Sequence, residues 1–361
     1  MLPLLYELDL PALADLLAQW NEPAYRARQI WQGLYRHFYN APDEFTALPK
    51  SLREKLASNL TFSGLAPVSQ LASSDKQTVK TLFRLHDGHV IEAVLMKYGD
   101  ADDTRHPPPA TRSRRTLCIS SQAGCAMGCV FCATGQMGFK RHLTSGEIVA
   151  QVMYYARLLS ETSEVSRVTN IVVMGMGEPF HNYDQTLAAI DRLNDPEGFN
   201  FGARRVTLST VGLVPSIRRF ADEMRQVNLA VSLHAADDET RGAMMPVNKK
   251  YDIAEVIAAC RYYVEKTGRR VTFEWALIHG VNDTPETARK LAALLKGLLC
   301  HVNAIPLNPT TGYSGKATDR ARAQIFKETL EQAGVPCTIR MRRGIDIAAG
   351  CGQLAGTSAQ K

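Results

Sequence analysis

The stretch CAMGCVFC, residues 125–132, decides how the chain folds and functions, because it carries three cysteines on one short loop. Its spacing lets the thiolates of Cys125, Cys129 and Cys132 bind a single polynuclear centre. Iron–sulfur clusters are usually held by four cysteine thiolates, so three predict a 4Fe–4S cluster with one iron open to another ligand. A structural zinc site with His142 as fourth ligand is the alternative. Zinc sites usually pair two short Cys/His clusters, and the sequence shows only one.

Length and composition are those of an ordinary globular protein. The chain has 361 residues, of which 45% are hydrophobic and 22% charged, enough for about two domains. No apolar run approaches the roughly 20 residues that span a bilayer, so we expect no membrane segment. The first residues lack the basic start of a signal peptide. Eight cysteines without a secretory signal predict a cytoplasmic protein whose thiols serve ligation or catalysis.

The net charge of +6 is mild, but the basic residues gather in short clusters. These are Arg112, Arg114 and Arg115; Lys140, Arg141 and His142; Arg204 and Arg205; Lys249 and Lys250; and Arg340, Arg342 and Arg343. One such cluster alone is usually a solvated surface. Their recurrence beside the segments that carry chemistry predicts a polyanionic substrate, most simply RNA.

The first part of the chain reads as a small helical domain followed by a β-hairpin. Apolar residues at three- and four-residue spacing predict helices over 11–20, 22–39 and 49–60, within a domain of residues 1–60. Alternation over 81–85 and 89–96, joined by His-Asp-Gly at 86–88, predicts the hairpin. It belongs to a segment, residues 61–110, that ends in a proline-rich linker.

From residue 116 onward, strands and helices alternate. The expected strands are 116–120, 168–174, 205–209, 227–233, 271–278, 301–307 and 337–341, and the expected helices are 145–159, 183–193, 215–225, 253–266, 285–298 and 318–332. Alternation of this kind predicts an α/β fold with a parallel sheet curled or closed into a barrel, here a partial (β/α)₆ barrel over residues 111–346. A doubly wound sheet would usually show a glycine-rich turn after its first strand. The cysteine loop follows the first strand instead.

Unusual residues recur where the predicted strands end. Active sites of βα barrels form at the carboxyl ends of the strands. The candidates there are Gly177 and Glu178 in the segment GMGEP, Ser209, the run Ser232, Leu233 and His234, and Asn308. Each alone is an ordinary strand-end polar group, cap or tight turn. Together they predict one rim, where the glycines admit a ligand close to the backbone and Glu178 binds an ammonium or ribose hydroxyl.

The cysteine loop and the Gly-Glu-Pro segment resemble those of radical S-adenosylmethionine enzymes. Four further motifs are CISSQAGC (118–125), SLHA (232–235), PVNKK (246–250) and Cys351 between two glycines. With these the chain resembles, from about residue 20 to residue 355, the RlmN/Cfr family of radical enzymes. That family includes the dual-specificity adenosine methyltransferases of 23S rRNA and tRNA and the related Cfr resistance enzyme.

The resemblance implies a cofactor set and partners. Cys125, Cys129 and Cys132 would hold a 4Fe–4S cluster, whose open iron would bind the amino and carboxylate groups of S-adenosyl-L-methionine. The rim residues would contact that molecule: Gly177, Glu178, Ser209, Ser232, Leu233, His234 and Asn308. An external flavodoxin- or ferredoxin-type protein would supply one electron. The enzyme would act as a monomer on 23S rRNA and tRNA, with no membrane partner.

The resemblance also implies roles for three further residues. Cys351, in the tail of residues 347–361, would carry a methyl group as S-methylcysteine in a ping-pong mechanism, and Cys118 would resolve the RNA adduct through a disulfide bond. Glu92 would be the proton acceptor, although an edge carboxylate facing water is an equal reading of its strand. Carbon 2 of adenine is the expected target. Cfr-like methylation of carbon 8 and a non-enzymatic Fe–S RNA-binding regulator stay open. A methylthiotransferase would need a second cysteine cluster.

Overall fold

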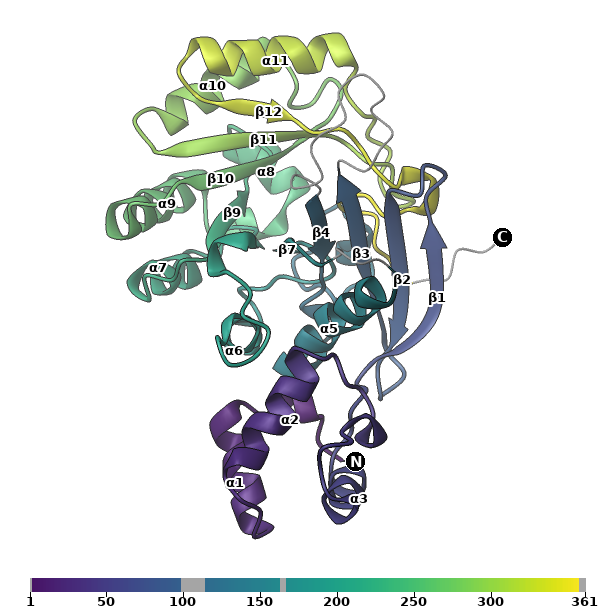
Figure 1. The fold of residues 1–361 in the computed structure, drawn as a ribbon. Helices are drawn as coiled ribbons and strands as arrows, with labels where there is room; N and C mark the ends of the chain where they lie inside the picture. The colour runs from purple at the N-terminus through teal and green to yellow at the C-terminus, as the bar shows by residue number, and fades with distance from the viewer. Residues whose placement is uncertain (1, 99–113, 163–166, 357–361) are drawn as a thin grey trace.

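A computed structural model describes residues 2–98, 114–162 and 167–356, and its centre is one ten-stranded sheet (Figure 1). The strands follow the order β1-β2-β3-β4-β7-β8-β9-β10-β11-β12. From β4 to β12 all neighbouring strands pair in parallel. Because β1 and β12 are the two edges of the sheet, it is a partial barrel rather than a closed one. The predicted α/β barrel fold is confirmed.

The parallel strands lie close to their predicted positions. They are β4 (Arg114–Cys118), β7 (Asn170–Val173), β8 (Val206–Thr210), β9 (Asn228–Ser232), β10 (Val271–Leu277), β11 (Cys300–Pro306) and β12 (Cys337–Ile339). β12 corresponds to the seventh predicted strand, 337–341, and extends the six-stranded barrel by pairing with β11.

Helices cover the outer face of the curved sheet (Figure 1). They are α5 (Ser145–Thr162), α6 (Tyr183–Asn194), α7 (Val214–Asp222), α8 (Asp238–Met244), α9 (Ile253–Thr267), α10 (Pro285–Leu295) and α11 (Arg320–Gln332). The short α8 was not predicted. In α9 the local sequence sets both ends: Asp252 and Glu255 form a capping box, and Gly268 ends the helix with φ of +64°.

The predicted hairpin is part of a three-stranded extension of the same sheet. It comprises β1 (Ala66–Ala72), β2 (Thr78–Arg84) and β3 (Val90–Tyr98), all antiparallel. β3 also pairs antiparallel with β4, where Val94 lies opposite Cys118. The hairpin strands therefore continue the barrel sheet without a break. β1 was not predicted, because most of its residues are exposed and its apolar positions do not alternate.

The N-terminal helices α1 (Leu10–Gln19), α2 (Tyr25–Tyr35) and α3 (Lys50–Asn59) form an arm below α5 (Figure 1). Helix α2 is shorter than the predicted 22–39, and Phe38 just beyond it has a left-handed φ of +59°. Trp31 and Leu34 share one hydrophobic core with the barrel. Within the described residues, no helix combines the length and apolarity that a bilayer span requires.

Candidate active site

The three cysteines lie on a loop framed by a small hairpin that sequence patterns did not reveal. Its strands are β5 (Gln122–Gly124) and β6 (Phe139–His142), which pair antiparallel. The one-turn helix α4 (Ala133–Gln136) follows directly after Cys132. The amide of Cys132 donates to the carbonyl of Cys129 at 3.2 Å, and Val130 donates to the carbonyl of Met244 at 3.0 Å. The loop is thus folded on itself and tied to α8.

The cysteine loop forms one wall of a cavity at the carboxyl ends of the parallel strands. Its empty space, including the open mouth, is about 1000 Å³, which suits a cofactor-sized ligand. The predicted site residues that line it are Cys125, Cys129, Cys132, Gly177, Glu178, Ser209, Ser232, His234, Asn308 and Cys351. Leu233 does not line it, because its side chain lies in the hydrophobic core. Ten predicted residues from distant parts of the chain therefore meet in one cavity.

Glu178 is a buried carboxylate held by backbone amides at the cavity wall. Its Oε1 accepts a hydrogen bond from Phe180 N at 3.0 Å and its Oε2 from Val211 N at 2.9 Å. Burial raises the pKa of Glu178 to about 7, although these hydrogen bonds act in the opposite direction and lower it. Gly177 has φ of +101°, and a Cβ there would lie 2.5 Å from that of Gln122. Only glycine fits, and Glu178 is poised to pair with an ammonium group.

His234 presents a neutral imidazole in a fixed orientation. The residue has a left-handed φ of +60°, and its Nδ1 accepts a hydrogen bond from Ala276 N at 2.9 Å. Burial, and then the positive charge of Arg241, lower the pKa of His234 to about 3. The ring is therefore uncharged at neutral pH, and its proton is on Nε2.

Asn308 contributes an unsatisfied acceptor to the cavity. Its Nδ2 donates to the carbonyl of Cys351 at 3.0 Å, whereas its buried Oδ1 has no hydrogen-bonding partner among the described residues. Buried polar atoms are rarely left unpaired. A ligand with a hydrogen-bond donor would satisfy the Oδ1 of Asn308. A cofactor that carries such a donor therefore fits this rim.

The donor set of the cavity suits a cluster of several irons better than one zinc ion. Three thiols face the same cavity, and burial raises the pKa of Cys125 to about 12. His142, the fourth ligand of the zinc alternative, does not line the cavity, and its Nδ1 lies 3.0 Å from Gln122 Nε2.

Cys118 and Cys351, 233 positions apart in the sequence, come together at a second cavity. Cys118 ends β4, and Cys351 is exposed on the C-terminal segment and lines both cavities. Protein surroundings raise the pKa of both thiols, chiefly by desolvation. Both cysteines are free thiols here, so the expected disulfide bond is not present.

Glu92 lies outside both cavities. Its side chain on β3 is 1% exposed and pairs with Lys80 Nζ at 2.9 Å. Its Oε2 accepts hydrogen bonds from Ala355 N at 2.9 Å and Gly356 N at 3.2 Å. The interpretation of Glu92 as an edge carboxylate facing water is wrong, because the residue is buried.

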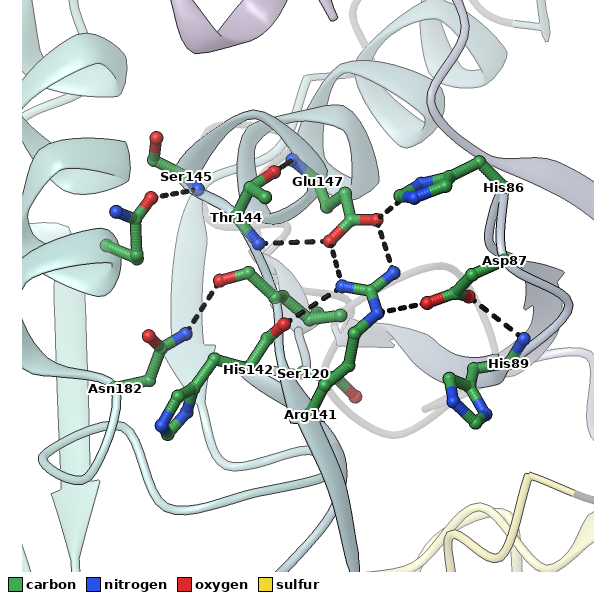
Figure 2. Close-up of polar contacts among 12 residues, drawn as sticks. His86, Asp87, His89, Ser120, Arg141, His142, Thr144, Ser145, Glu147 and Asn182 are labelled. Atoms are coloured by element: carbon green, nitrogen blue, oxygen red, sulfur yellow. Dashed lines mark hydrogen bonds and ion pairs between the residues drawn. The ribbon is translucent and has the colours of Figure 1, made fainter. Parts of the chain in front are cut away.

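Arg141, from one of the predicted RNA-binding clusters, is engaged in the network that Figure 2 shows. Its Nη1 and Nη2 donate to the two carboxylate oxygens of Glu147 at 2.8 Å each, and its Nε donates to Asp87. Glu147 lies in the first turn of α5, and Asp87 belongs to the hairpin turn between β2 and β3. Arg141 therefore fastens that turn to α5 and is not free to bind phosphates.

We expect Arg141→Met to destabilise the protein by about 3 kcal/mol, because it leaves the Glu147 carboxylate, 3% exposed, without its charged partner. Equilibrium urea unfolding measures the change. Lys50→Ala is the control, because Lys50 and Glu54 form an exposed pair that contributes less than about 1 kcal/mol. Equal changes in the two variants would contradict the network's structural role.

Other basic residues do surround the second cavity. Arg340, Arg342 and Arg343 line it together with Tyr98. The guanidinium groups of Arg114 and Arg343 lie 4.2 Å and 4.4 Å from the centroid of the Tyr98 ring. Arg112 lies outside the described residues. This rim combines positive charge with an aromatic ring, which is typical of nucleic-acid surfaces.

Two buried polar residues of the site were missed by sequence reasoning. Arg241 is fully buried and donates to Val211 O at 2.7 Å and Asn248 Oδ1 at 2.7 Å, which ties the PVNKK segment to the strand ends. Glu274 lines the first cavity, and burial raises its pKa to about 7. The acidic residue in the otherwise apolar centre of β10 could have indicated Glu274 as a site residue. Nothing in the sequence of α8 indicates that Arg241 is buried.

A partial barrel with a three-cysteine loop at the carboxyl ends of its strands is the architecture of radical SAM enzymes. The sequence profile of the Radical SAM superfamily matches residues 119–292, and that of the ribosomal RNA large subunit methyltransferase N-terminal domain matches residues 4–61. The chain belongs to the RlmN family of radical SAM RNA methyltransferases.

Named relatives and a crystal structure support this assignment along nearly the whole chain. Dual-specificity RNA methyltransferase RlmN 1 of Myxococcus xanthus is 49% identical, over 98% of this chain and 94% of that protein. A probable RlmN of Chloroflexus aurantiacus is 48% identical, over 98% and 92%. The crystal structure of a radical SAM methyltransferase from Sphaerobacter thermophilus is 50% identical with a TM-score of 0.92, covering 98% of this chain and 100% of that one.

Proposed function

We propose that this protein methylates carbon 2 of an adenosine in 23S rRNA and in tRNA, with Cys351 as the methyl carrier. The observation that carries the proposal is the position of Cys351, which lines both cavities. A thiol at such a junction can receive a methyl group on one side and deliver it on the other. The relatives' names, dual-specificity RNA methyltransferases, agree with two RNA substrates.

The first cavity would hold the 4Fe–4S cluster on Cys125, Cys129 and Cys132, with S-adenosylmethionine beside it. When bound, these groups supply the methyl group and the radical that removes a hydrogen atom. Glu178 would pair with the ammonium group of the cofactor, which would keep the carboxyl ionised despite its raised pKa. Asn308 would accept a hydrogen bond on its free Oδ1. An external flavodoxin- or ferredoxin-type protein would provide the electron, and the protein would act as a monomer.

The second cavity would receive the target adenosine, flipped out of the RNA. Cys118 and Cys351 lie at its wall, and Arg340, Arg342 and Arg343 surround it with positive charge. Guanidinium groups would bind the phosphates on either side of the nucleotide. The adenine ring carbon would then face the sulfur of Cys351.

Two cysteines are needed because an adenine ring carbon is a poor nucleophile, and a covalent relay divides one difficult step into easier ones. Burial raises the pKa of the Cys351 thiol, against the positive charge of Arg340; its proton would leave as its sulfur takes the methyl group from the cofactor. After carbon–carbon bond formation, the adduct would lose one electron, which returns to the cluster, and the hydrogen of the ring carbon as a proton. The sulfur of Cys118 would then attack that of Cys351: the S–S bond forms, the bond between sulfur and the methylene carbon breaks, and the Cys118 thiol proton completes the methyl group of the released RNA. An external thiol reductant would reopen the disulfide bond for the next turnover.

The test is to treat unmodified 23S rRNA and tRNA with anaerobically reconstituted protein and to identify the methyladenosine isomer by mass mapping. We expect 2-methyladenosine in both RNAs. A product methylated at carbon 8 would assign the protein to Cfr-like chemistry. Tight RNA binding by the reconstituted protein without any methylated product would favour a regulator.

We expect the double substitution Arg114→Ala and Arg343→Ala to weaken RNA binding and to reduce the steepness of its salt dependence, because lost phosphate contacts release fewer counterions. The measurement is the dissociation constant over a series of salt concentrations. Lys290→Ala is the control, because Lys290 lies on α10 and pairs with Glu286. An unchanged salt slope in the double variant would make the two arginines ordinary surface charges.

A further inference from the structure

The segment that carries Cys351 is fastened at both ends by one buried ion pair. Lys80 Nζ and Glu92 Oε1 lie 2.9 Å apart, with side chains 7% and 1% exposed. Before the cysteine, Lys80 Nζ donates to the carbonyl of Ala348 at 3.2 Å. After it, Glu92 Oε2 accepts the amides of Ala355 and Gly356 at 2.9 Å and 3.2 Å. The two ends of a nine-residue span, 348–356, thus meet at a single pair.

The pair belongs to the rigid part of the molecule. Lys80 is on β2 and Glu92 on β3, and the register of these strands (Lys80 opposite Val94, Leu82 opposite Glu92) makes them diagonal neighbours on one face of the sheet. Two buried charges are tolerated when they are paired and hydrogen-bonded. Here both oxygens of Glu92 and the ammonium group of Lys80 have partners, so the pair is a fixed point of the sheet.

The middle of the segment is held by different groups, from the helix that follows Cys132 and from Asn308. Ala133 N donates to the carbonyl of Gly352 at 2.7 Å, and Thr134 Oγ1 to that of Leu354 at 2.6 Å. Asn308 Nδ2 donates to the carbonyl of Cys351 itself. These partners follow the cluster cysteines or face the cofactor cavity. Gln353 Nε2 also donates to the carbonyl of Pro309 at 3.0 Å. Lys80 and Glu92 differ from these partners because they lie on β2 and β3, away from the cysteine loop.

We propose that Lys80 and Glu92 are positioning residues that set the Cys351 sulfur at the junction of the two cavities. This rests on the proposed function of Cys351 as methyl carrier. Glu92 in this arrangement is an anchor rather than a proton acceptor: it lines neither cavity, and both of its oxygens are occupied by donors. The ammonium group of Lys80 is as necessary for this anchor as the carboxylate of Glu92, because each of them fastens one end of the segment.

The first test uses the protein alone. In the double variant Lys80→Met/Glu92→Leu, no buried charge is left unpaired, so the barrel should fold, but both fastenings of the segment are lost. We expect the amides of Gly350 and Gln353, which are hydrogen-bonded within the segment, to exchange with deuterium at least about ten times faster than in the wild-type protein, because the released segment opens locally. Hydrogen–deuterium exchange with peptide mass spectrometry measures the rate. The control Asp283→Asn weakens another ion pair, between the buried Asp283 and Arg322, and should leave the exchange rate of this segment unchanged.

The second test separates an anchor from a pair that merely stabilises the sheet. The exchanged pair Lys80→Glu/Glu92→Lys restores the attraction between the strands, but it offers the wrong groups to the Ala348 carbonyl and the Ala355 amide. We expect the amides of its segment to exchange as fast as in the double variant. Exchange at the wild-type rate in the exchanged pair, or in the double variant itself, would overturn the proposal.

The third test separates an anchor from a proton acceptor. Methyl loading of Cys351 by S-adenosylmethionine needs no RNA, so a base that acts on the adenine would not affect it. We expect Glu92→Gln and Lys80→Met each to slow loading at least about tenfold, with cofactor affinity within about twofold of wild type. Loading at the wild-type rate in Glu92→Gln, with loss of RNA turnover, would make Glu92 a catalytic base. If the wild-type protein itself fails to load, the proposed function fails, while the hydrogen-exchange result still tests the anchor.

Discussion

Replacing Cys118 with alanine is expected to trap the protein on its RNA as a covalent adduct. The variant keeps Cys351, so it can take up a methyl group and join the resulting methylene to the adenine. It lacks the second sulfur, which lines the same cavity as Cys351 and would break the bond between protein and RNA. The adduct should accumulate to nearly one per active chain. A denaturing gel reveals it as a band shift that RNase removes, and mass spectrometry locates the modified nucleotide on Cys351.

The controls for this result are other cysteine variants. Cys351→Ala and the double variant of Cys118 and Cys351 should form no adduct and no methylated RNA, because the carrier sulfur is missing. Cys260→Ala should behave as wild type, since Cys260 is buried in the core and lines neither cavity. Wild-type turnover by both Cys118→Ala and Cys351→Ala would leave the methyl-carrier mechanism without support.

Periodicity predicted most of the barrel because most of its strands and helices carry a local sequence signal. A helix such as α9 shows an apolar stripe, a capping box and a terminal glycine within a few residues. The missed elements lack such signals. Strands β5 and β6 are three and four residues long, too short for a pattern, and they pair across the cysteine loop. Their existence depends on long-range folding of that loop, which a local reading does not contain.

The sequence predicted those parts of the site that depend on the type and spacing of its residues. Cysteine spacing and the polar ends of parallel strands indicated the cavity, because carboxyl ends of such strands converge on one edge. The environment of each side chain was not predictable. In the sequence Arg141 belongs to a basic cluster of the kind found on surfaces, whereas in the structure it pairs with Glu147 and Asp87. For Glu92, an edge carboxylate facing water was an open alternative to a proton acceptor, whereas in the structure the C-terminal segment covers the residue. Both outcomes depend on contacts between segments far apart in the sequence.

Replacing any one of the three loop cysteines is expected to remove an iron–sulfur cluster and all methyl transfer. The wild-type protein, reconstituted without oxygen, should be brown and bind about four irons per chain, because three thiolates and one open position suit a 4Fe–4S cluster. Cys129→Ala should lose the colour, since Cys129 is a buried residue of the cavity wall and no other cysteine of the loop can replace it. Iron analysis and visible absorption measure the loss.

His142→Ala gives the matched control, because it distinguishes the cluster from the zinc alternative. His142 is exposed on β6 beside Gln122 and lies outside the cavity, so its loss should leave the iron content and the visible spectrum unchanged. A zinc site that used His142 as fourth ligand would instead lose its metal in this variant. Stoichiometric zinc without iron in the reconstituted wild-type protein, lost on His142→Ala, would contradict the cluster and with it the radical chemistry proposed for this cavity.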